Sequence, residues 1–206
     1  MAAAVLVLIL VGVLGLGLIA GVLARSDYAT TQNRALEQPV PFSHQHHVAG
    51  LGIDCQYCHT SVTESQFAGL PPTHTCMTCH SQLWTNADML APVRQSLEQN
   101  KPLQWQRVHD LADYVYFNHS VHVTNGVPCQ ACHGRVDKMP LMQQSKSLTM
   151  GFCLDCHRDP APNLRPASAI TAMGWKPGPD TPSGHALMKQ YGIDPQGLTD
   201  CVTCHR

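Results

Sequence analysis

The sequence has little of what most cores and active sites are made from. Aromatic residues make up 6% of its 206 positions and charged residues 13%, with a formal net charge of −1. This balance excludes the basic footprint of a nucleic-acid-binding protein. No paired carboxylates or glycine-rich loop support separate catalysis, and the scattered Asp110, Asp113, Asp137 and Asp155 are expected on the solvated surface. The 15 Gly and 15 Pro indicate short helices with irregular connections.

No cysteine lies outside one pattern, Cys-x-x-Cys-His, which occurs as CQYCH at 55–59, CMTCH at 76–80, CQACH at 129–133, CLDCH at 153–157 and CVTCH at 201–205. Zinc ribbons place no demand on the residue after the second cysteine, and a disulfide framework does not explain five trailing histidines. With 13 His in 206 residues, chance does not supply them. The pattern therefore predicts five covalently attached c-type haems. The predicted attachment residues are Cys55, Cys58, Cys76, Cys79, Cys129, Cys132, Cys153, Cys156, Cys201 and Cys204.

The spacing suits this chemistry, because two thiols three positions apart can add across the two vinyl groups of one haem. The following imidazole then lies beneath the iron as the proximal ligand. The predicted proximal ligands are His59, His80, His133, His157 and His205. Five haems leave about 41 residues for each, so the haems are expected to pack on one another and replace an apolar core.

The first 24 residues contain no charged side chain, and Arg25 is the first charge. About 20 apolar residues span a bilayer as a helix, whereas signal-peptide cores run to about 7–15. The length favours a retained anchor, although Val22-Leu23-Ala24 also suits signal cleavage. Gly17 and Gly21 form a small-xxx-small pair that can seat one membrane helix against another. Because haem c is attached outside the bacterial cytoplasmic membrane, we expect a single-pass protein with its haem domain on the periplasmic side.

The body contains an internal repeat. The stretch FSHQHHVAGLGIDCQYCH (42–59) aligns with FNHSVHVTNGVPCQACH (117–133), and a second haem motif follows each copy. Such repeats are structural units. The sequence thus predicts an anchor at 1–24, a linker at 25–41 and a pentahaem domain at 42–206. That domain comprises two-haem units at 42–80 and 117–157 and a fifth haem at 201–205. The insertion at 81–116 and the Pro-rich linker at 158–200 are candidate docking surfaces.

The repeat also sorts the remaining histidines. His44 aligns with His119 and His47 with His122, whereas His46 aligns with Val121 and is not expected to be a ligand. Histidines at i and i+3 share one face of a helical turn, and each can reach a different iron. The predicted distal ligands are His44, His47, His119 and His122.

The fifth distal ligand stays open. A cluster of Met139, Met142 and Met150 precedes the fourth haem motif, and His109 lies between the repeats. Thioether ligation would raise the potential of a haem near the fourth site. The candidates are Met150 or Met142, followed by His109.

The Phe-x-His-x-x-His…Cys-x-x-Cys-His unit resembles the small c3- and c7-type multihaem cytochromes. That resemblance implies that His44 serves the His59 haem and His119 the His133 haem, with His47 and His122 serving other haems. The stretch WQRVHDLADYVYFNHSVHVTNGVPCQACHGRV and the later LTMGFCLDCHR resemble the pentahaem subunit of bacterial alternative complex III. Ala112 stands where that family leads us to expect proline.

This resemblance implies a mainly α-helical, irregular fold with little β-structure and one transmembrane helix. It also implies an electron-transfer subunit that works with other membrane and periplasmic subunits of a quinol-oxidising complex. The acceptor would be a periplasmic cytochrome c, a copper protein or an oxidase. Two alternatives remain open. One is a membrane-anchored quinol dehydrogenase acting alone, and the other is a reductase of a small nitrogen or sulfur oxyanion. The expectation of two axial ligands on most irons favours electron transfer over catalysis.

Overall fold

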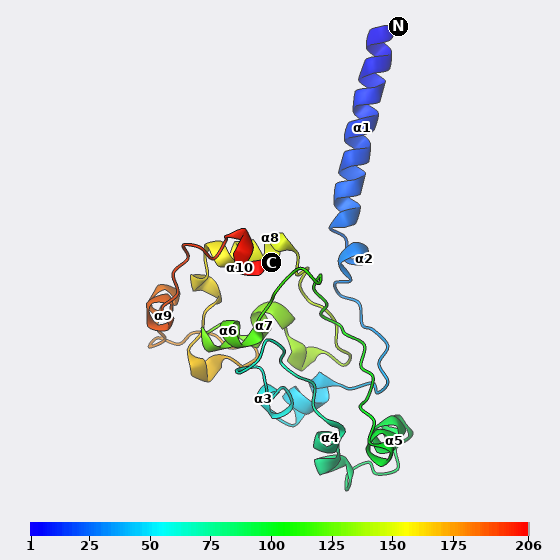
Figure 1. Cartoon of the computed structure of the whole chain (residues 1–206), viewed down its shortest axis with the longest axis vertical. Helices are drawn as coiled ribbons and strands as arrows, with labels where there is room; N and C mark the ends of the chain where they lie inside the picture. Colours follow the sequence, from blue (N-terminus) through cyan, green and yellow to red (C-terminus); the bar gives the residue numbers. More distant parts are fainter. Residues whose placement is uncertain (206) are drawn as a thin grey trace.

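The computed structural model describes residues 1–205, in which a long N-terminal helix projects from a body of short helices (Figure 1). The α-helices are α1 (Ala2–Ala24), α2 (Asp27–Thr30), α3 (Cys55–Cys58), α4 (Thr73–His80), α5 (Ala91–Gln99), α6 (His119–Thr124), α7 (Cys129–His133), α8 (Met150–Arg158), α9 (Gly184–Tyr191) and α10 (Cys201–Cys204). The shorter turns are η1 (Gln45–Gly50, a π-helix) and the 3-10 turns η2 (Asp88–Leu90), η3 (Val136–Lys138), η4 (Ala161–Asn163) and η5 (Ala167–Ala169). The predicted mainly α-helical, irregular fold is confirmed, since between residues 1 and 205 only two isolated β-bridges form.

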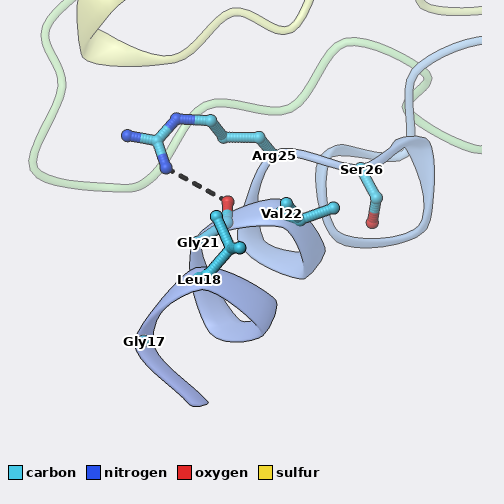
Figure 2. Close-up of a pocket in the computed structure, with 6 residues that line it drawn as sticks. All are labelled: Gly17, Leu18, Gly21, Val22, Arg25 and Ser26. Atoms are coloured by element: carbon cyan, nitrogen blue, oxygen red, sulfur yellow. Dashed lines mark hydrogen bonds between the residues drawn. The ribbon is translucent and has the colours of Figure 1, made fainter. Parts of the chain in front are cut away.

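Helix α1 has the length and composition to cross a membrane. Its 23 residues correspond to about 34 Å of helix, slightly more than the hydrocarbon core of a bilayer. None of its residues is buried. Either a membrane anchor or a signal sequence has these properties. Near its C-terminal end, Gly17 and Gly21 open a shallow hollow beside Arg25, whose Nη1 donates to the Gly21 carbonyl at 3.1 Å (Figure 2).

Residues 25–41, expected to be a linker, lie against the body. Gln32 Nε2 donates to the Ser145 carbonyl at 3.0 Å, and Asn33 N donates to the Gln144 carbonyl at 2.7 Å. Further on, Val40 is buried with Leu90 and Val93 in the cluster that joins α4 to α5. This segment therefore connects the base of α1 to the haem-binding region.

The apolar core is small and divided. Among residues 1–205, eleven hydrophobic residues are buried. Five of them lie within 161–187, in the segment expected to be a linker (Ala161, Leu164, Ala169, Ile170 and Leu187). Tyr191 of α9 also donates its hydroxyl to the Arg165 carbonyl at 2.9 Å. The 158–200 segment is therefore a packed part of the fold.

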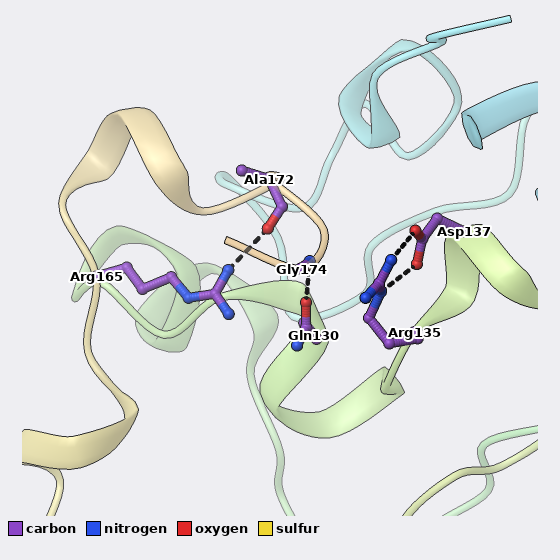
Figure 3. A network of polar contacts seen from close by, with 6 residues as sticks. All are labelled: Gln130, Arg135, Asp137, Arg165, Ala172 and Gly174. Atoms are coloured by element: carbon purple, nitrogen blue, oxygen red, sulfur yellow. Dashed lines mark hydrogen bonds and ion pairs between the residues drawn. The ribbon is translucent and has the colours of Figure 1, made fainter. Parts of the chain in front are cut away.

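A polar network joins this segment to α7 (Figure 3). Gln130, within the third haem motif, accepts a hydrogen bond from Gly174 N at 2.6 Å, and Arg165 donates to the Ala172 carbonyl at 2.7 Å. Nearby, Arg135 makes a two-pronged contact with Asp137 at 2.7 and 2.5 Å. The expectation of a solvated Asp137 is wrong, because only 8% of this residue is exposed. The hydrogen bonds from Arg135 lower the pKa of Asp137 and keep it ionised.

Candidate haem sites

Each haem motif lies on its own short helix, namely α3, α4, α7, α8 and α10. One helical turn places positions i and i+3 on the same side, so both thiols of a motif face one direction. Side-chain caps begin two of the short helices, one with a haem motif (α3) and one with the repeat histidines (α6). Asp54 accepts a hydrogen bond from Gln56 N at 2.8 Å at the start of α3, and Asn118 likewise accepts from Ser120 N at 2.9 Å at the start of α6. None of the ten cysteines forms a disulfide.

The predicted proximal and distal histidines face one another across gaps of one size. Ring centres lie 6.3 Å apart for His47 and His80, 6.3 Å for His119 and His133, and 6.1 Å for His122 and His157. Two imidazoles bound on opposite sides of one metal ion, at about 2.0 Å each, have ring centres about 6.3 Å apart. The spacing therefore fits a haem iron between the members of each pair.

His44 lies near His59. Its pKa is lowered to about 4, chiefly by burial and secondly by the charge of His59. Its Nδ1 is buried and has no hydrogen-bond partner. An uncharged imidazole retains the lone pair that a metal ligand needs. His44 is therefore suited to the distal position at the His59 haem.

The hydrogen bonds of the histidine rings also suit metal binding. In seven histidines, Nδ1 lies 2.7–3.2 Å from a backbone carbonyl oxygen. A carbonyl can only accept, so Nδ1 must carry the hydrogen, and Nε2 is left with its lone pair free to bind a metal. The seven rings belong to His47, His59, His80, His119, His122, His157 and His205.

The two repeat copies have the same local geometry. Phe42 makes an edge contact with His44 at 4.9 Å and stacks on His47 at 4.3 Å. Phe117 makes the matching contacts with its two histidines at 4.8 and 4.5 Å. In each copy the second histidine bonds through Nδ1, at 2.8 Å, to the carbonyl four residues earlier. One phenylalanine therefore holds both rings of a copy at a fixed angle.

Three other histidines are exposed. They are His46, which stacks on Trp84 at 5.8 Å, and His74 and His185. Of the candidate methionines, Met150 is 60% exposed in the first turn of α8 and Met142 is half-buried. The neighbouring Met139 is buried and packs in the interior. His109 contacts His133 through its Nε2 at 3.3 Å, a contact that no sequence pattern indicates.

Thiols from different motifs lie close enough to shift one another's pKa, which indicates which motifs are neighbours. A hydrogen bond between Cys55 and Cys129 raises the pKa of Cys55 and lowers that of Cys129. The pKa of Cys58 is raised by burial and by the nearby Cys76, and the hydroxyl of Tyr57 lies 3.2 Å from that of Thr78. These contacts place the first motif between the second and the third.

The remaining motifs continue the series. Burial raises the pKa of Cys132 to about 11, and the neighbouring Cys156 and Cys153 contribute. Cys153 in turn lies near Cys204, which adds to the effect of burial in raising its pKa. The His157 ring bonds to the carbonyl of Leu198, just before α10. The third, fourth and fifth motifs are therefore consecutive neighbours.

Comparison with known proteins agrees with this geometry. Residues 115–206 match the family described as cytochrome c7 and related cytochrome c. This segment is therefore similar to multihaem cytochromes c of the c7 type. The chain is also similar to the menaquinone reductase, multiheme cytochrome c subunit, of Nitratidesulfovibrio vulgaris strain Hildenborough. The two are 36% identical over 98 residues, which is 47% of this chain and 46% of the relative. The chain thus spans about half the length of that curated relative.

Proposed function

We propose that this cytochrome is the electron-relay subunit of a membrane quinone oxidoreductase and takes electrons from quinol oxidation to a periplasmic acceptor. The observation that carries the proposal is the set of paired histidines, because an iron with an imidazole on both faces has no open position for a substrate. The similarity to a subunit of a menaquinone reductase supports the link to quinone. The sequence resemblance to alternative complex III supports the oxidising direction.

We further propose five haems in the spatial order His80, His59, His133, His157 and His205. The contacts between motifs support this order. Helices α8 and α10 lie toward the base of α1, whereas α4 lies at the opposite end of the body (Figure 1). If α1 anchors the protein, the His205 end faces the membrane and the His80 end faces away. Partner subunits and the acceptor would then contact opposite ends of the row.

The two-unit organisation remains part of this proposal. In each unit, the first histidine of the repeat would serve the haem of its own copy and the second the haem of the following motif. His47 opposite His80 and His122 opposite His157 support the second assignment. Together they account for four of the five distal ligands.

The test of the proposed function starts from gently solubilised membranes separated on a native gel and stained for haem. We expect this cytochrome in a large multi-subunit band that oxidises quinol with cytochrome c as acceptor, while the purified chain does not. Quinol oxidation by the purified chain alone would show that it is itself the dehydrogenase. A band that reduces menaquinone but does not oxidise quinol would reverse the proposed direction.

We propose Met150 as the distal ligand of the fifth haem. The ring contact of His205 is with Tyr114, at 5.7 Å, and not with a histidine. Cys204 lies near Cys153, and Met150 is one helical turn before Cys153 with an exposed side chain. A thioether ligand on this haem would make it the one of highest potential.

The corresponding variant is Met150→Ala, with Met142→Ala as its matched control. We expect Met150→Ala to lower the highest haem potential by at least about 59 mV, which corresponds to a tenfold change in the one-electron reduction equilibrium constant. The absorption band of the iron–methionine bond should disappear with it. Loss of that band in Met142→Ala instead would move the assignment to Met142.

A further inference from the structure

One proximal histidine differs from the other four. The Nδ1 atoms of His59, His80, His157 and His205 bond to backbone carbonyls, whereas Nδ1 of His133 faces a side chain. That side chain is His109, whose Nε2 lies 3.3 Å away, with ring centres 4.3 Å apart and planes at 70°. The His133 ring thus lies between His119 on one side, at 6.3 Å, and His109 on another.

The directions of the atoms assign the roles. His133 needs Nε2 for iron, so its Nδ1 carries the hydrogen and donates. His109 must then accept through Nε2, the atom that histidine would otherwise offer to a metal in this arrangement. We infer that His109 is a positioning residue for the His133 haem, holding the proximal ring through an imidazole-to-imidazole hydrogen bond, and is not an axial ligand.

This bond has an electronic consequence. A neutral imidazole nitrogen is a much more basic hydrogen-bond acceptor than a peptide carbonyl oxygen. A more basic acceptor draws the Nδ1 hydrogen further from His133 and leaves that ring a stronger electron donor to its metal. His109 therefore lowers the potential of the central haem in the proposed row. The inference rests on haem attachment at 129–133 and on none of the partners of the proposed function.

The test compares His109→Leu, which removes the acceptor, with His109→Gln, which keeps one. His185→Leu, a change of an exposed histidine on α9, is the matched control. In redox titrations of the purified holoprotein followed by electron paramagnetic resonance, we expect His109→Leu to raise one haem potential. The expected shift is up to tenfold in the equilibrium constant, about 59 mV. His109→Gln should restore part of it, and every haem should keep its spin state.

Two results would overturn the inference. Unchanged potentials in His109→Leu would mean that the bond does not tune the haem. A new high-spin haem in that variant would mean that His109 is an axial ligand. If His109→Leu does not acquire its haems, His109→Gln and His109→Asn provide the same test, because neither variant retains the imidazole that an axial ligand role would need. All these readings are independent of quinol activity, so they also stand apart from the test of the proposed function.

Discussion

Replacing His47 with alanine is expected to convert one haem from six-coordinate to five-coordinate, while replacing the adjacent His46 leaves every haem unchanged. His47 faces His80 at 6.3 Å, the separation that a shared iron requires. His46 instead stacks on Trp84 and is exposed. Two neighbouring histidines in one turn therefore have opposite expected outcomes.

Electron paramagnetic resonance and resonance Raman spectra of the oxidised protein measure this directly. In His47→Ala, a high-spin signal should replace about one-fifth of the low-spin iron. The second repeat supplies an independent copy of the test, with His122→Ala as the variant and Val121→Ala as its control. A high-spin signal from His46→Ala, or none from His47→Ala, would contradict the assignment of the pairs.

The second large effect concerns stability. Replacing Gly184 with alanine is expected to destabilise the protein by about 3 kcal/mol or more. Gly184 begins α9, and a Cβ there would overlap the backbone carbonyl of Ala161 in η4. Backbone cannot rotate away as a side chain can. Relief would require α9 to move, and with it Leu187, which is only 1% exposed.

Thermal unfolding followed by far-ultraviolet circular dichroism tests this expectation. Gly178→Ala is the control, since its Cβ would meet only Thr181 Oγ1 at 3.9 Å in an exposed turn. We expect a clear fall in the unfolding midpoint for Gly184→Ala and almost none for Gly178→Ala. Equal midpoints would show that α9 does not pack against η4 in solution.

The sequence predicts the haem-attachment motifs and the fold class because both depend on contiguous residues. Covalent attachment needs two thiols and an imidazole within five positions, and a membrane-length helix needs only an apolar run. The repeat also allows four distal ligands to be predicted, because histidines that align in the two copies are expected to have the same role. These residues are His44, His47, His119 and His122. These ligand roles await the spectroscopic tests above.

Other features depend on contacts between distant segments, which the sequence does not display. The Pro-rich 158–200 segment looks like a linker, yet Leu187 and Ile170 are buried within it. The sequence alone suggests a solvated Asp137, whereas in the structure Asp137 forms an ion pair with Arg135. The order of the motifs is also hidden, because the second motif lies at one end and the first beside the third. Each of these features arises where the chain folds back and brings distant segments together. A local sequence pattern does not reveal such contacts.

The carbonyl bonds to Nδ1 have one more consequence, for tolerance to mutation. Every amino acid has a backbone carbonyl, so substitutions at Leu83 or Leu198 leave the acceptor of the bonded histidine in place. The hydrogen bonds of these seven histidine rings therefore do not depend on the side chains of the residues that accept them. His133 is the exception, because its acceptor is the side chain of His109. Among the five predicted proximal histidines, His133 is therefore the one whose hydrogen bond can be changed by a single side-chain substitution outside the haem motif, at His109, with the backbone unchanged.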